Sequence, residues 1–245
     1  MRGTPDAREP GAICEECLAS FAPMPGRVCE VCGSAPETSF LGTQTQPSPD
    51  VDSGSDPMVC PACQVRTYAF DRARSLAAYD TALVHAIVML KFERIEPLGA
   101  WFAERLAEVV RREAETLAAD VVVPVPLHRQ HERERGYNQA DLIARPLAKR
   151  LGLPYRAVLL MRTRPRPDKQ VLSMTERWES VRGAFATRPG SQVDNLRVLL
   201  VDDVMTTGAT LDACARALRG AGAKSVIGLT VARAARHPQV SSDDS

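Results

Sequence analysis

The stretch VLLVDDVMTTGATL, residues 198–211, joins a run of strand-forming residues to two adjacent aspartates and a threonine-rich loop. Residues 196–201 are predicted to form a strand, and the continuous apolar run at 198–201 has the character of a strand that is buried on both faces of a parallel sheet. Residues 209–221 follow a helical period. The stretch therefore predicts a strand, a loop and a helix, with Asp202 and Asp203 at the carboxyl end of the strand.

The loop after the two aspartates has the residue types of a phosphate site. Ligands of open parallel sheets bind beyond the carboxyl ends of the strands. A helix that begins near Gly208 turns unpaired N–H groups and its positive end toward that place. Thr206, Thr207 and Thr210 add hydroxyl donors. Carboxylates that can accept from sugar hydroxyls thus precede donors for a phosphate, which fits a phosphorylated ribose. A simple helix cap at Asp202 would explain only one of the two carboxylates.

Strands and helices alternate on both sides of this stretch. Apolar patterns predict further strands at residues 73–79, 120–127 and 225–232. They predict helices at residues 81–91, 97–119 and 138–151. Pro146 should kink or break the last of these helices. The alternation implies a parallel sheet with helices on both faces, in which VVVPV and VLLVD form adjacent or near-adjacent central strands.

The N-terminal part of the chain differs in composition from the rest. Residues 1–67 are short of large apolar residues, and residues 34–57 have the composition of a long loop or linker. Such a segment cannot bury a core of its own, so a metal would have to hold it together. We expect a cysteine-rich module at 1–67, an α/β domain at 68–235 and a disordered polar tail at 236–245.

Six of the seven cysteines form three CxxC pairs. Two such pairs can supply the four thiolates of a tetrahedral zinc site. The better-formed knuckles, VCEVCG and VCPAC, predict the Zn²⁺ ligands Cys29, Cys32, Cys60 and Cys63. The alternative set, across a shorter gap, is Cys14, Cys17, Cys29 and Cys32. The seventh cysteine, Cys214, lies on an apolar helix face and is expected to be buried.

Bulk charge and hydropathy set the broad class of protein. The chain has 245 residues with a net charge of +1, so its overall charge does not indicate a nucleic-acid binder. The N-terminus lacks the apolar core of a signal peptide, and the apolar run at residues 82–90 is too short to span a bilayer. We expect a cytoplasmic protein without a membrane span, whose reduced cysteines bind metal rather than pair.

Residues 198–211 closely resemble the signature by which type I phosphoribosyltransferases bind phosphoribosyl pyrophosphate (PRPP). The resemblance implies that Asp202 and Asp203 are the catalytic acidic pair, which holds the ribose 2′ and 3′ hydroxyls. It also implies that the following loop cradles the 5′-phosphate. The residues of that loop are Met205, Thr206, Thr207, Gly208, Ala209 and Thr210.

Other segments narrow this resemblance to one branch. PVPL, RGYNQ, LKFER and ERWESVRGAF, together with DDVMTTGAT, are similar to the ComF family from about residue 14 to residue 233. The resemblance implies a phosphoribosyltransferase-like fold with an N-terminal zinc-ribbon-like module, and a link to DNA uptake in natural transformation. It implies PRPP with Mg²⁺ and structural Zn²⁺, but assigns no acceptor. Many relatives carry four CxxC pairs and have Asn where this chain has Ser180.

The same resemblance places several basic residues near the pyrophosphate. His128, Arg129 and Arg135 follow PVPL, where the pyrophosphate loop of the family lies. Lys91 belongs to LKFER, and Lys169 lies in a basic, proline-rich segment similar to the mobile hood loop that closes over PRPP. Arginine binds a diphosphate through paired donors. The alternatives are solvated basic loops and, for Lys91, a cation at a helix end.

Two functions are compatible with these features. The first is an enzyme that binds PRPP with Mg²⁺ and transfers phosphoribosyl to an acceptor. The second is a non-catalytic protein of DNA uptake, in which the zinc ribbon and basic loops contact single-stranded DNA or competence proteins and the PRPP site is regulatory or vestigial. Aromatic residues make up only 5% of the chain, which argues against base stacking. No sequence feature indicates the oligomeric state.

Overall fold

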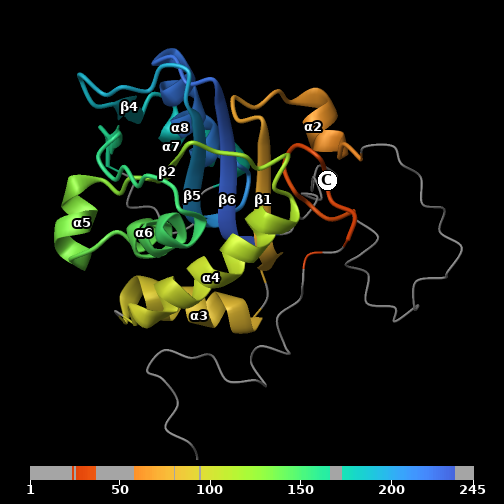
Figure 1. Cartoon of the computed structure of the whole chain (residues 1–245), viewed down its shortest axis with the longest axis horizontal. Coiled ribbons are helices and arrows are strands. Elements are labelled where there is room, and N and C mark those ends of the chain that lie inside the picture. Colours follow the sequence, from red (N-terminus) through yellow and green to blue (C-terminus); the bar gives the residue numbers. More distant parts are fainter. Residues whose placement is uncertain are drawn as a thin grey trace, which may run out of the picture.

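The computed structural model describes residues 24, 26–36, 58–79, 81–93, 95–165 and 173–234. Its main sheet has four parallel strands in the order β1–β6–β5–β2 (Figure 1). The strands are β1 (Arg72–Ala78), β2 (Val121–Pro124), β5 (Arg197–Met205) and β6 (Ser225–Arg233). A second, antiparallel pair consists of β3 (Leu160–Arg162) and β4 (Phe185–Thr187).

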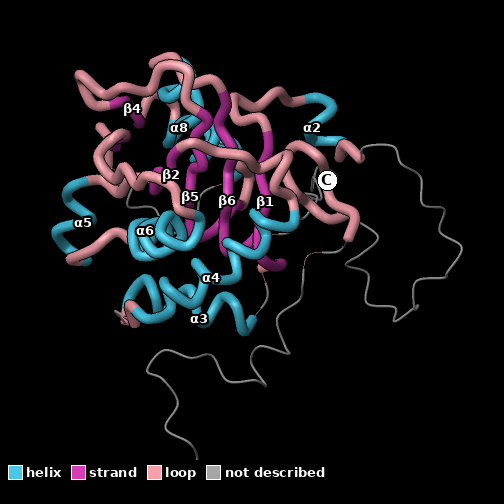
Figure 2. The backbone as a smooth tube through the Cα atoms, in the orientation of Figure 1, coloured by secondary structure: helices cyan, strands magenta, loops and turns pink. Residues whose placement is uncertain are grey.

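Helices cover both faces of the main sheet, as predicted (Figure 2). One face packs against α3 (Thr81–Phe92), α4 (Pro97–Arg112) and α6 (Gln139–Leu151). The other packs against α8 (Ala209–Gly220), and α7 (Met174–Val181) packs in turn against α8. Alternate residues of β5 point to opposite faces, so that Leu200 joins the core under α8 whereas Leu199 joins the core under α4 and α6. The α/β fold class is therefore confirmed.

Two strands differ from their predicted limits. β5 continues to Met205 because its last residues pair with β6, so Asp202 and Asp203 lie within the strand instead of just after it. β2 ends at Pro124; the Val125 N–H still donates to the Val201 carbonyl at 2.8 Å, and the residue after it, Pro126, has no N–H to extend the ladder. β2 pairs with β5 as predicted, but it is the terminal strand of the four-stranded order and not a central one.

Two helices also differ from the prediction. α4 ends at Arg112 instead of residue 119, and the carboxylate of the next residue, Glu113, accepts a hydrogen bond from Arg74 Nε at 2.8 Å.

α6 continues through Pro146 without the predicted break. Pro146 leaves the Leu142 carbonyl without its usual helical donor. Gly99 of α4 packs against this carbonyl so closely that a Cβ there would lie 2.5 Å from the oxygen.

Further helices occur in described segments for which the sequence predicted none. The segment after PVPL forms α5 (Arg129–Arg135), and α7 begins with a capping box between Ser173 and Glu176. A short helix, α2 (Pro61–Val65), follows Cys60. Most of the predicted linker and the whole predicted tail lie outside the described residues, as do Cys14, Cys17 and Lys169.

Within the described parts of the chain, no helix combines the length and the apolar character needed to cross a bilayer.

Candidate functional site

Asp202 and Asp203 lie side by side near the carboxyl end of β5, and both are buried, with exposures of 9% and 5%. Asp202 Oδ1 accepts a hydrogen bond from the Asp203 N–H at 2.9 Å. Burial, and then the charge of Asp203, raise the pKa of Asp202 to about 8. The pair is thus a buried acidic site whose charge must be balanced.

Lys91 supplies part of that balance. It lies in the last turn of α3, and its Nζ is 2.6 Å from Asp203 Oδ2. This oxygen makes no hydrogen bond of good geometry within the described part of the chain. A buried carboxylate oxygen of this kind can still accept a hydrogen bond from a ligand hydroxyl. The structure therefore brings the predicted residue Lys91 to the acidic pair.

The threonine loop, residues 205–210, connects β5 to α8. Gly208 is the N-cap of α8 with a φ of 84°, a conformation that favours glycine, and it provides no side-chain cap. Thr207 Oγ1 accepts from the Ala209 N–H at 3.3 Å. The side chains of Met205 and Ala209 are buried, so these two residues can contribute mainly backbone groups to a ligand.

Arg177 of α7 reaches the same loop. Its Nη1 donates a hydrogen bond to Thr206 Oγ1 at 3.1 Å. Its segment, ERWESVRGAF, matched the family pattern, but the sequence assigned Arg177 no role. Its contact with the loop depends on α7 packing against α8, which periodicity does not predict. Arg177 is therefore a candidate ligand-binding residue that only the structure identifies.

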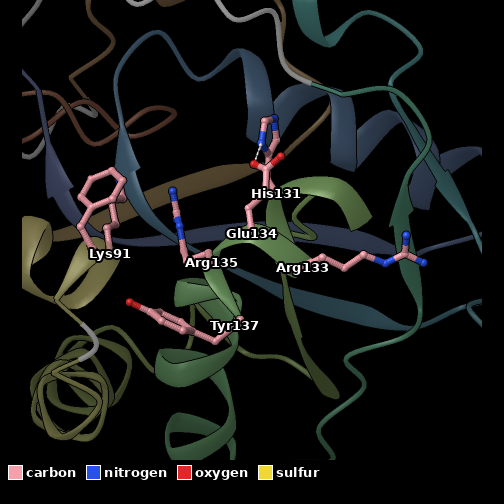
Figure 3. A pocket seen from close by; sticks show the side chains of 8 residues that line it. Lys91, His131, Arg133, Glu134, Arg135 and Tyr137 are labelled. Carbon is pink, nitrogen blue, oxygen red and sulfur yellow. Dashed lines mark hydrogen bonds and ion pairs between the residues drawn. The ribbon is translucent and has the colours of Figure 1, made fainter.

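A pocket of about 610 Å³ lies between the end of α3 and α5 (Figure 3). Arg135 lines it, donates to Gln139 Oε1 at 2.6 Å, and has its guanidinium 5.0 Å from the ring centre of Phe92. Phe92 is 67% exposed. The complete lining is Lys91, Phe92, His131, Arg133, Glu134, Arg135, Gly136 and Tyr137. Lys91 thus links this basic pocket to the acidic pair.

The predicted basic residues do not all line this pocket. His128 and Arg129 line a second pocket, of about 620 Å³, together with Arg162 and Arg188. His128 is the N-cap of α5, where its Nδ1 accepts from the Gln130 N–H at 3.3 Å. The helix cap accounts for the orientation of this histidine, so a contact between His128 and pyrophosphate stays a prediction.

The first-choice cysteines come together as predicted. The Sγ atoms of the four residues all lie within 4.8 Å of one another, and the residues are Cys29, Cys32, Cys60 and Cys63. The Sγ atoms of Cys32 and Cys60 are 3.7 Å apart. Tetrahedral coordination with Zn–S bonds of about 2.3 Å places neighbouring sulfur atoms about 3.8 Å apart. The cluster therefore fits a metal ion held by four thiolates.

The cysteine cluster packs directly on the α/β domain. Cys29 and Cys32 are fully buried in the core that also contains α8. The Ala73 N–H of β1 donates to the Val31 carbonyl at 2.7 Å. Figure 1 shows the segments that carry the cluster beside β1. Cys214, as predicted, is buried in the same core, and it does not belong to the metal-binding group.

Comparison with known proteins agrees with this arrangement. Residues 139–244 match a phosphoribosyl transferase domain. The chain is 30% identical over 217 residues to DNA utilization protein YhgH of Salmonella typhi, which covers 87% of this chain and 93% of that protein. It is 29% identical over 179 residues to Competence protein F of Haemophilus influenzae, covering 71% and 78% of the two chains. It is 28% identical over 232 residues to Competence protein ComFC of Bacillus subtilis, covering 90% and 84%.

Proposed function

Because the chain belongs to the ComF family, we propose that it binds PRPP with Mg²⁺ and transfers the phosphoribosyl group to an acceptor. The observation that carries this proposal is the acidic pair directly before the threonine loop. Asp203 Oδ2 is buried and retains the capacity to accept a hydrogen bond. The start of α8, where the N-cap Gly208 has no side chain to accept from them, offers N–H groups a few residues later.

In this proposal each part of the site has a distinct task. Asp202 and Asp203 accept from the ribose hydroxyls, and the threonine loop donates to the 5′-phosphate. Arg177, held at Thr206, adds a positive charge beside that phosphate. Lys91 and Arg135 line the basic pocket, where they can stabilise pyrophosphate.

The reaction requires no nucleophilic side chain. The bond between ribose C1′ and the pyrophosphate oxygen breaks, pyrophosphate leaves with the electron pair, and an electron pair of the acceptor forms the new bond to C1′. Mg²⁺ neutralises part of the charge on the diphosphate. The protein contributes by orienting the ribose and stabilising the charge of the leaving group.

A second function, handling of DNA during uptake, is favoured by a different observation. The second pocket is lined by arginines from α5, α6 and the β3–β4 region, namely Arg129, Arg145, Arg162 and Arg188. Such residues can contact phosphates of a nucleic acid. The names of the relatives also refer to DNA utilization and competence. If this function alone is correct, binding will depend on polynucleotide and salt and not on PRPP.

Calorimetric titration with PRPP and Mg²⁺ tests the enzyme proposal. Asp203→Asn removes a charged acceptor, whose hydrogen bond to a hydroxyl contributes about 1.5–3 kcal/mol, so the affinity should fall by roughly 10- to 150-fold. Thr207→Val should also weaken binding. Asp120→Asn is the matched control, because Asp120 pairs with Arg197 at the amino end of β5. The absence of any binding by the wild type at millimolar PRPP would refute the proposal.

A further inference from the structure

Arg233, the last residue of β6, contacts both the cysteine cluster and the threonine loop. Its side chain is buried, with an exposure of 2%. Its Nε donates to the Cys32 carbonyl at 3.2 Å, and its Nη2 lies 3.8 Å from Cys32 Sγ. Its Nη1 donates to the Met205 carbonyl at 3.0 Å and also to the Thr206 carbonyl. One guanidinium therefore bridges the two sites.

A tyrosine makes a second connection to the same loop. Tyr68 follows α2, whose sequence includes Cys63, and its hydroxyl donates to the Thr207 carbonyl at 3.1 Å. The ring of Tyr68 also lies close to Gly208, because a Cβ on that glycine would be 3.1 Å from Tyr68 Cε1. The carbonyls of three consecutive residues, 205–207, are thus all bound by the side chains of Arg233 and Tyr68, and Tyr68 belongs to the same buried core as Cys29 and Cys32.

The Met205 carbonyl also accepts from the Ala234 N–H at 2.9 Å, next to the β5–β6 pairing, so the side-chain hydrogen bonds to Thr206 and Thr207 are the ones that determine how the rest of the loop presents its donors. In a trans peptide the C=O and the following N–H point in opposite directions, and the described residues contain no cis peptide bond. When the carbonyls of residues 205–207 are held toward the cluster, the N–H groups of residues 206–208 point away from it. That is the orientation that a phosphate at the start of α8 requires.

The positive charge of Arg233 links the position of this side chain to the metal. Within the described residues, no carboxylate lies within ion-pair distance of this guanidinium; its partners are carbonyls and the Cys32 sulfur. Burying an arginine without a counter-charge is unfavourable. Zn²⁺ held by four thiolates carries a net negative charge, so a metal-loaded cluster would stabilise Arg233 where it lies.

We propose that Arg233 is a positioning residue through which the metal-loaded cysteine cluster keeps the threonine loop in its ligand-binding conformation. On loss of the metal, the sheet should remain folded while the loop becomes mobile. The consequence for PRPP rests on the proposed function, whereas the ordering of the loop does not.

Hydrogen–deuterium exchange, measured without ligand, tests this proposal at the Ala209 and Asp212 amides, whose N–H groups donate to Thr207 Oγ1 and to the Gly208 carbonyl of the loop. Removal of zinc from the wild-type protein by a chelator should accelerate exchange there by about tenfold or more, roughly the effect of losing one charge-assisted hydrogen bond. Zinc-loaded Arg233→Met should show the same acceleration, and Arg233→Lys should recover part of the protection. Unchanged loop exchange after chelation of the wild type would overturn the proposal, even if Arg233→Met does not fold.

Arg74→Met is the matched control. Arg74 is also a buried arginine, with an exposure of 5%, and it donates to the carbonyls of Cys29 and Glu30 in the same knuckle. It makes no hydrogen bond to the threonine loop among the described residues. When Arg74→Met and the wild type each carry one zinc per chain, the loop amides of the two proteins should exchange at the same rate. Equal acceleration in both variants would indicate a general loosening of the knuckle and would also overturn the proposal.

Titration with PRPP and Mg²⁺ separates this proposal from the proposed function. If both hold, chelation and Arg233→Met each weaken PRPP binding by about tenfold or more. If the zinc-loaded wild type ignores PRPP but its loop exchange still depends on zinc and Arg233, only the proposed function fails. If metal-free protein binds PRPP as tightly as the loaded form, with equal loop exchange, the role of Arg233 is refuted while PRPP binding stands.

Discussion

Replacing Asp202 with asparagine should change the pH dependence of stability while preserving the fold. Burial, and then the charge of Asp203, raise the pKa of Asp202 from its ordinary value of 3.8 to about 8. Between these values the folded protein keeps a proton that the unfolded chain has lost. A group whose pKa is raised by folding stabilises the protein fully below the unfolded pKa, and this contribution is lost as the pH rises through the folded pKa.

The magnitude follows from the proton difference. One bound proton changes the free energy of unfolding by about 1.4 kcal/mol per pH unit. From pH 5 to pH 7, wild-type protein should therefore lose about 3 kcal/mol through Asp202. The Lys91 charge and the hydrogen bond from the Asp203 N–H oppose the upward shift of this pKa, but burial is the larger effect. Asp202→Asn has no carboxyl to ionise and should lack this part of the slope.

Urea unfolding of the ligand-free protein at pH 5, 6 and 7 measures the effect. Asp120→Asn is the control, and it should leave the pH dependence of stability unchanged. The hydrogen bond from Arg197 lowers the pKa of Asp120 to about 2. Asp120 is ionised throughout this range in both states, so its removal should shift stability by a constant amount. Parallel stability curves for wild type and Asp202→Asn would show that Asp202 is already ionised at pH 5, which would refute the reasoning.

Two glycine substitutions test close contacts of the backbone. Gly208→Ala should lower the free energy of unfolding by about 1–2 kcal/mol, because its φ is 84° and a Cβ would lie 2.8 Å from Met205 Cε. Thermal unfolding measures this loss, and an unchanged melting temperature would contradict the prediction. Gly99→Ala should lower stability by about 1–3 kcal/mol, because its Cβ would lie 2.5 Å from the Leu142 oxygen. Gly220→Ala, whose Cβ would meet nothing within 4 Å, is the control for both and should be near neutral.

The sequence by itself determined the local features of the protein. The apolar run before Asp202 predicted a buried strand, and Gly208 correctly marked the start of α8. The two better-formed cysteine knuckles were the pair that the structure brings together. These features depend on residues that are close in the chain, where side-chain period, glycine conformation and ligand spacing restrict the backbone directly.

Only the tertiary structure decided which distant residues meet at the site. Lys91 reaches Asp203 because α3 packs on the sheet near the end of β5, and Arg177 reaches Thr206 because α7 packs against α8. Arg233 lies 201 positions from Cys32, and the sheet order β1–β6–β5–β2 places it between the cysteine cluster and the threonine loop. Local periodicity predicts a strand but does not specify its neighbours, because strand order is set by how all the apolar faces pack together.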